Sequence, residues 1–244
     1  MESNTKEKDL YVELPSYRGI YENYELRCKA DEIFEKTKDL KAVEDFCKRE
    51  LKKPIIAKLK RESEIIRRFQ DSTFKNFIVK DKIQEKALKQ AKHYVENIQK
   101  FLKDGTNIII CGERHCGTGK SRLASTITNE LLNDCIAAKF ISSTKMINKI
   151  KQNFDTTEYT NTEILTIDDL GKERNTEWVS EQIFAIFNSR YEEVKPIIIT
   201  TEGSIDDLLN HYKEKGNAMI GRIIEKAIII ILDGKDYRWI RQKP

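Results

Sequence analysis

A lysine and a serine at the end of a glycine-rich turn are the residues of this chain best suited to phosphate chemistry. The stretch Asn107–Ser121, NIIICGERHCGTGKS, passes from an apolar, β-prone run into glycines that precede Lys120. Glycines let successive backbone N–H groups turn inward around an anion, and the N-terminus of a following helix adds partial positive charge. We therefore expect Lys120 to reach the β and γ phosphates of a nucleotide, and the Ser121 hydroxyl to bind Mg²⁺.

The turn is longer than the usual phosphate-binding loop. The pattern G-x-x-x-x-G-K-[ST] would place its first glycine at position 114, which is Arg114, whereas the strand ends at Gly112. His115 and Cys116 lie in the excess. The alternative is a chance GTGKS, but the apolar strand before it and an acidic strand after it favour a binding loop.

The acidic strand is the second signal. Ile164–Asp169 reads ILTIDD, a buried run that ends in two carboxylates. Open α/β sheets bind phosphates at the carboxyl edge of their strands, so we expect Asp168 to hold Mg²⁺ and Asp169 to orient or deprotonate the attacking water. The alternative is a strand-ending turn, which also favours aspartate.

Composition limits the classes of function. The 244 residues carry a net charge of only +4 although 34% are charged, so any nucleic-acid contact requires a local basic patch. No apolar run has the length of a membrane span, and the N-terminus lacks the apolar core of a signal peptide. Five cysteines without C-x-x-C spacing predict free thiols in a reducing, cytoplasmic setting and no zinc site.

Strands and helices alternate along most of the chain, which predicts an α/β fold with a mainly parallel sheet flanked by helices. We expect strands at 108–111, 139–142, 163–167, 196–201 and 227–232, and a short end strand at 237–240. We expect helices at 82–102, 122–132, 144–154, 177–191, 204–211 and 218–226, with a polar connection at 155–162. Residues 69–79 are expected to be irregular.

The N-terminal part has a different character. Within residues 1–68, the stretch Tyr24–Leu59 has helical periodicity and changes from acidic to basic along its length. We expect residues 1–68 to form a helical partner-docking region and 69–244 a catalytic domain. A solvated helix face is the alternative explanation of the basic run.

Six motifs occur in order: RFQDSTFKNF, the CG…GTGKSRLA loop, TIDDLG, FNSRYEEVKPIIITT, GRIIEKA and GKDYR. From about Phe69 to Arg238 the chain resembles the bacterial replicative helicase loaders of the DnaC/DnaI type, AAA+ ATPases related to the IstB transposition helpers. Together the motifs are specific, whereas GKDYR alone would not be.

This resemblance implies an AAA+ P-loop ATPase that uses ATP/ADP and Mg²⁺. The residues implied in nucleotide binding are Gly112, Gly117, Thr118, Gly119, Lys120, Ser121 and Arg122, with Ser121 and Asp168 at the metal. The catalytic residues implied are Asp169, Thr201 as a polar sensor, and Arg222 acting on the nucleotide of a neighbouring subunit. Two features depart from the family pattern: the lengthened loop, and Glu202 where relatives often carry Asn.

The resemblance also implies contacts with single-stranded DNA. Lys151 and Phe154 match one such position of the family, and Thr176 and Trp178 match another. A cation beside an aromatic ring suits a groove that binds strands of any sequence. Packing of Phe154 and Trp178 in the core is the alternative.

The predicted function is an ATP-dependent loader that binds a hexameric replicative DNA helicase and single-stranded DNA during replication initiation. Self-association through the AAA+ domain is expected, and no membrane partner. Two alternatives stay open: an IstB-like ATPase helper of a transposase, and a nucleotide-binding adaptor with little hydrolysis.

Overall fold

A sheet of five parallel strands forms the centre of the larger part of the chain. The computed structural model describes residues 23–113, 117–234 and 236. Within them the strands lie in the order β2-β3-β4-β1-β5, and each neighbouring pair is parallel. Their bounds are β1 Asn107–Cys111, β2 Ala138–Ser142, β3 Ile164–Asp168, β4 Ile197–Thr200 and β5 Ala227–Ile231. The α/β fold class predicted from the sequence is confirmed.

The strand order explains how the two motif strands meet. In sequence β2 stands between β1 and β3, but in space β2 lies at the edge of the sheet. The strand between β1 and β3 is β4, which pairs with both. An extra strand, β4, therefore separates the two motif strands, and its carboxyl end lies between the loop and the acidic pair.

Runs of isoleucine explain why these segments become strands. β-Branched side chains suit a pleated surface, and a sheet covered on both faces needs apolar residues at consecutive positions. Ile108 pairs in register with Ile198 on one side and Ile228 on the other. All five residues of β1 and all four of β4 are buried.

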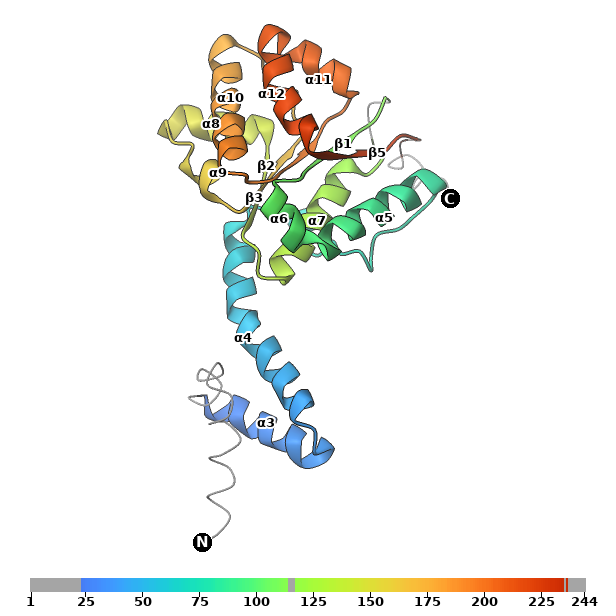
Figure 1. Cartoon of the computed structure of the whole chain (residues 1–244), viewed down its shortest axis with the longest axis vertical. Coiled ribbons are helices and arrows are strands. Elements are labelled where there is room, and N and C mark those ends of the chain that lie inside the picture. Colours follow the sequence, from blue (N-terminus) through green and yellow to red (C-terminus); the bar gives the residue numbers. More distant parts are fainter. Residues whose placement is uncertain (1–22, 114–116, 235, 237–244) are drawn as a thin grey trace. The chain divides into compact units, whose positions relative to one another are not determined.

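Helices cover both faces of the sheet (Figure 1), with α5, α6 and α7 on one face and α8, α10, α11 and α12 on the other. The helices before the sheet are α5 Lys82–Glu96 and α6 Ile98–Asp104, after a 3-10 turn η2 Arg67–Phe69. The later helices are α7 Lys120–Asn133, α8 Ser143–Asn153, α9 Thr157–Asn161, α10 Glu177–Glu192, α11 Ile205–His211 and α12 Lys213–Glu225.

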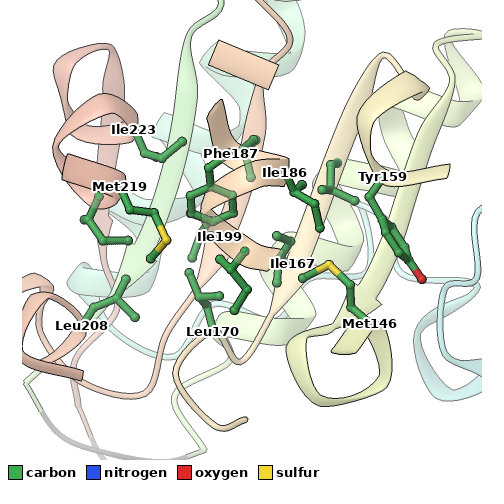
Figure 2. Packing of buried hydrophobic residues seen from close by; sticks show 14 of the residues in the cluster. Met146, Tyr159, Ile167, Leu170, Ile186, Phe187, Ile199, Leu208, Met219 and Ile223 are labelled. Carbon is green, nitrogen blue, oxygen red and sulfur yellow. The ribbon is translucent and has the colours of Figure 1, made fainter. Parts of the chain in front are cut away.

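The main core lies between the sheet and the second of these layers (Figure 2). Ile167 of β3 and Ile199 of β4 share one buried cluster with Phe187 of α10 and Met219 of α12. No helix among the described residues is both long and apolar enough to cross a membrane.

The chain divides into two compact units, Met1–Leu59 and Lys60–Pro244. The described part of the smaller unit contains α3 Tyr24–Thr37 and most of α4 Leu40–Glu62. Asn23 caps α3 by accepting a hydrogen bond from the Leu26 amide, and the two helices pack around Ala30, Val43, Phe46 and Cys47. The functional division expected at residue 68 stays a prediction.

Three details differ from the elements expected. The single helix predicted over 82–102 is wrong, because it breaks at Asn97 into α5 and α6. The connection at 155–162 contains α9, since Asp155 accepts a hydrogen bond from the Thr157 amide and Tyr159 is fully buried. The last helix, α12, begins at Lys213 rather than 218, and it includes Gly216, where a Cβ atom would lie 2.4 Å from the Leu209 carbonyl oxygen. The short strand expected at 237–240 lies outside the described residues.

Candidate nucleotide-binding site

The turn after β1 has the backbone conformation that an anion cradle requires. Gly117 has φ +68° and Gly119 has φ +104°, in the region that favours glycine. Helix α7 begins directly after Gly119, which provides no side-chain cap, so its first-turn N–H groups are available to a ligand. The Thr118 Oγ1 is buried without a hydrogen-bond partner among the described residues. The excess residues 114–116 lie outside the described part.

Close packing fixes the start of the turn. A Cβ atom at Gly112 would lie 2.8 Å from the Leu232 carbonyl oxygen, so only glycine fits there. The next amide, that of Glu113, donates to Asp233 Oδ1 at 2.7 Å. The segment after β5 therefore holds the turn in place from outside.

Lys120, at the first position of α7, is buried, with 7% of its surface exposed. Its ammonium has one hydrogen bond to a described residue, a long contact of 3.5 Å with the Glu202 carbonyl oxygen. Burial lowers the pKa of Lys120, while the charges of Glu202, Asp233 and Asp169 oppose this shift. A buried cation with so few partners is arranged to receive an anion.

The acidic pair lies at the carboxyl end of β3. Thr200, on the adjacent strand β4, donates from its hydroxyl to Asp168 Oδ1 at 2.6 Å and accepts from the Asp169 amide at 2.8 Å. Burial raises the pKa of Asp168, and hydrogen bonds from Thr200 and Ser121 oppose the rise. Asp169 has φ +57°, an uncommon conformation for aspartate, which the bond to Thr200 helps to hold.

Thr201, the predicted sensor, has its hydrogen bond with β1, whereas the acidic pair is contacted by its neighbour Thr200. It is buried, and its amide donates to the Ile110 carbonyl oxygen at 3.1 Å. The hydroxyl that contacts the acidic pair belongs to Thr200, which sequence reasoning missed. Adjacent strand residues face opposite sides, so the pattern Thr-Thr allowed only one of them to face Asp168.

The glycine turn and the acidic pair border one cavity of about 720 Å³. Gly117 to Arg122, Asp168 and Asp169 line its polar side, and Phe69, Phe77 and Ile78 belong to another part of the wall. Arg122 donates to the Asn76 carbonyl oxygen at 2.7 Å, and its guanidinium lies 5.7 Å from the centre of the Phe77 ring. Its contacts thus tie α7 to the irregular segment before α5.

Arg222 is far from this cradle in the fold. It lines a second hollow of about 280 Å³ with residues such as Asn107 and Ile197, at the amino ends of β1 and β4. Its guanidinium lies 5.4 Å from the ring centre of Phe184 and 5.9 Å from that of Tyr191. The structure therefore does not bring Arg222 to the site of its own chain.

The four residues expected at DNA divide between two helices. Lys151 of α8 lies 5.7 Å from the ring centre of Trp178 in α10, and Thr176 caps α10. Phe154 is 83% exposed, so packing in the core does not account for it. Trp178 is half-buried against the main core and has both a packing contact and the cation contact.

Comparison with known proteins agrees with this geometry. Residues 43–243 match the family of the IstB-like ATP binding protein. YqaM of Bacillus subtilis, an uncharacterized protein, is 31% identical over 190 residues, which cover 72% of this chain and 60% of YqaM. The replicative helicase loader DnaC of Escherichia coli K12 is 25% identical over 183 residues, 69% of this chain and 70% of DnaC. The resemblance inferred from the motifs is confirmed.

Solved structures show the same fold. The crystal structure of the DnaC helicase loader superposes with a TM-score of 0.60 at 24% identity, covering 69% of this chain and all of that one. AMPPCP-bound DnaA from Aquifex aeolicus gives a TM-score of 0.53 at 25% identity, covering 68% of this chain and 51% of DnaA. With its glycine cradle, buried lysine and acidic pair on an AAA+ P-loop fold, the chain belongs to the IstB-like ATP binding protein family.

Proposed function

We propose that the larger unit binds ATP in the 720 Å³ cavity and hydrolyses it. The observation that carries this proposal is the buried Lys120 ammonium with a single long hydrogen bond to a described residue. The uncapped start of α7 and the unpartnered Thr118 hydroxyl support it, because they too suit an anion. Phe69, Phe77 and Ile78 offer the base an apolar and aromatic surface in the same cavity.

The donor set also fits Mg²⁺. The Ser121 hydroxyl is close enough to Asp168 to affect the pKa of that carboxyl group, so a hydroxyl and a carboxylate meet at the start of α7. Both are oxygen ligands, which Mg²⁺ prefers. Ser121 and Asp168 would hold the ion, which would supply positive charge beside the phosphates of bound ATP.

Asp169 is the residue proposed to orient or deprotonate the attacking water. We expect Asp169→Asn to keep nucleotide binding within about threefold and to slow phosphate release by about 100-fold or more, because the base is lost while the glycine turn and Lys120 stay in place. The exposed Asp134→Asn, at the end of α7 opposite Lys120, is the matched control and should hydrolyse ATP like the wild type. Slow turnover by the wild-type chain itself would favour the nucleotide-binding adaptor with little hydrolysis.

The smaller unit is proposed to dock on a hexameric replicative helicase. A relative named as a replicative helicase loader supports this role. Within the described residues, Tyr24, Leu40 and Ile55 are large apolar side chains of this unit with 49–73% of their surface exposed. Exposed apolar side chains on helices are suited to packing against another protein.

The test is co-elution of the full-length chain with the helicase of its host on a sizing column. Leu40→Ser combined with Ile55→Ser should abolish co-elution, whereas the exposed Lys52→Ser control should retain it. Binding to a transposase or to duplex DNA, with no helicase complex, would move the assignment to the transposase helper.

Single-stranded DNA is proposed to contact Lys151, Phe154, Thr176 and Trp178. The exposed Phe154 ring and the Lys151–Trp178 pair support a stacking surface. Stacking contributes roughly 1–3 kcal/mol per base, so Phe154→Ala should weaken binding at least several-fold. Fluorescence anisotropy with a labelled oligonucleotide measures this, with the exposed Tyr191→Ala, away from these residues, as the control. Equal affinity of Phe154→Ala and wild type would remove this residue from the DNA site.

Arg222 is proposed to act on the nucleotide of a neighbouring copy in a self-associated assembly. Its location at the amino ends of the strands, away from its own cradle, supports action between subunits. Mixing Arg222→Ala with Lys120→Ala subunits is the test, because each mixed contact can pair an intact cradle with an intact arginine. Recovery of turnover in the mixture supports the role, and none at any ratio contradicts it.

A further inference from the structure

Lys172 links two carboxylates that follow neighbouring strands. It lies in the turn after β3, and its Nζ is 2.8 Å from Asp169 Oδ2 and 2.7 Å from Glu202 Oε1. Glu202 follows β4, the strand adjacent to β3. The three side chains are 30–41% exposed and all line the cavity, so a ligand in the cavity can reach this bridge.

A carboxylate at the position of Glu202 is unfavourable for a site that binds a triphosphate. The Glu202 carbonyl oxygen accepts from Lys120 Nζ, so this residue borders the phosphate-binding lysine. With Asp168 and Asp169 it brings three carboxylates to this end of the cavity, against the ammonium groups of Lys120 and Lys172. Since like charges repel, a cation beside Glu202 would offset this repulsion of a terminal phosphate, in addition to Lys120 and the proposed Mg²⁺.

Lys172 has the chemistry for that task. Burial lowers its pKa, but hydrogen bonds to Asp169 and Glu202 raise it by more, so the side chain is a cation at neutral pH. An ammonium has three N–H donors, and the two carboxylates use two of them. The flexible four-carbon stem lets the ammonium exchange one partner for another without movement of the backbone.

We propose that Lys172 binds the terminal phosphate of ATP and makes the site selective for ATP over ADP. Glu202 holds the ammonium in place in the absence of that phosphate, and the phosphate replaces Glu202 as a partner of Lys172 while Asp169 stays bound. This inference rests on the proposed ATP site. The proposal gives Glu202 a role, which is to keep the Lys172 ammonium at this end of the cavity when no terminal phosphate is bound.

The test compares the affinities of the full-length chain for AMPPCP and for ADP, measured by competition with a fluorescent nucleotide. Lys172→Gln should weaken AMPPCP binding about tenfold, the size expected for a charged hydrogen bond, and ADP binding less than about twofold. The matched control is Lys92→Gln, an exposed lysine of α5, which should change neither value. A thermal melt of each variant checks that it is folded.

Glu202→Gln provides an independent arm with the opposite sign. Removing this carboxylate should raise the affinity for AMPPCP a few-fold relative to ADP, because Lys172 is released and repulsion falls. Lys172→Gln should then cost more AMPPCP affinity in the Glu202→Gln background than in the wild type, because Glu202 no longer competes with the phosphate for Lys172. If the ratio of AMPPCP to ADP affinity is unchanged in both single variants, the proposed role of Lys172 is overturned, but the proposed ATP site is not. A wild-type chain that binds neither nucleotide overturns the proposed ATP site as well.

Discussion

Two buried cations lie at opposite ends of the same sheet, and their surroundings differ. Arg190 of α10 is fully buried, and its two terminal nitrogens donate four hydrogen bonds of 2.7–3.0 Å to backbone carbonyl oxygens. The acceptors are Tyr159, Thr162, Glu163 and Pro196, which precede β3 and β4. Lys120, after the carboxyl end of β1, is 7% exposed and has one contact of 3.5 Å with a described residue.

The difference separates a structural cation from one arranged to bind a ligand. Burial lowers the pKa of both groups, that of Arg190 to about 9, so both pay for desolvation. The carbonyl groups around Arg190 offset that cost within the fold. Around Lys120 the cost of desolvation is not fully offset until an anion binds. Removing Arg190 should therefore lower the stability of the fold, whereas removing Lys120 should lower the affinity for nucleotide.

The largest effect is expected at Arg190. Arg190→Met keeps much of the side-chain volume but leaves four carbonyl groups without their donor, so the free energy of unfolding should fall by about 3–5 kcal/mol. Urea unfolding of the full-length chain measures this, with Arg61→Met, on an exposed arginine, as the control. A loss no greater than that of the control would mean that water replaces the guanidinium at this end of the sheet.

Lys120→Ala should produce the complementary result. We expect nucleotide affinity to fall about 100-fold, which corresponds to about 2.7 kcal/mol, because the only buried cation among the described residues of the cradle is lost. The free energy of unfolding without nucleotide should stay equal or rise, since a poorly paired buried charge is removed. Equilibrium binding and urea unfolding report the two quantities. A variant that unfolds more easily yet binds ATP normally would reverse the comparison.

The sequence predicted the parts of the site that lie within single segments. The isoleucine run before Gly112, the GTGKS turn and the paired aspartates at the end of β3 each indicate a local structure that the fold confirms. Contacts between segments were not predictable in this way. The choice of Thr200 over Thr201 and the Lys172–Glu202 bridge depend on β4 lying between β1 and β3, an order that no single stretch specifies.

Arg190 carried a signal that was available in the sequence. Ile183, Ile186, Phe187 and Arg190 follow helical spacing on one face of α10, and all four are buried. A charged residue at the end of such an apolar series is either at the margin of the core or inside it with polar partners. The partners here are backbone carbonyls at strand starts, which have no signature in the sequence.

A cluster of three lysines around one carboxylate extends the comparison of Arg190 with Lys120, and its expected effect on stability is the smallest of the three. Glu64, in the larger unit, accepts ion-pair contacts of 2.6–2.8 Å from Lys139 of β2 and from Lys145 and Lys149 of α8. Lys139 and Lys149 also contact Glu158 of α9, at 2.6 and 3.6 Å. These lysines are paired with carboxylates and, unlike Lys172, line neither of the two cavities described above, so we expect them to act in stability rather than in ligand binding.

Burial would raise the pKa of Glu64, but the three lysines outweigh it and lower the pKa to about 2 from an ordinary value of 4.5. A carboxyl group whose pKa is lower in the folded state stabilises the fold above its unfolded pKa, and this contribution is lost as pH falls. We therefore expect Glu64→Gln to reduce the free energy of unfolding by about 1–2 kcal/mol at pH 7. The gap between wild type and variant should narrow between pH 4.5 and about 2. Urea unfolding at several pH values measures it against Glu193→Gln, an exposed control, and a gap that stays constant with pH would show that the charge of Glu64 does not carry the effect.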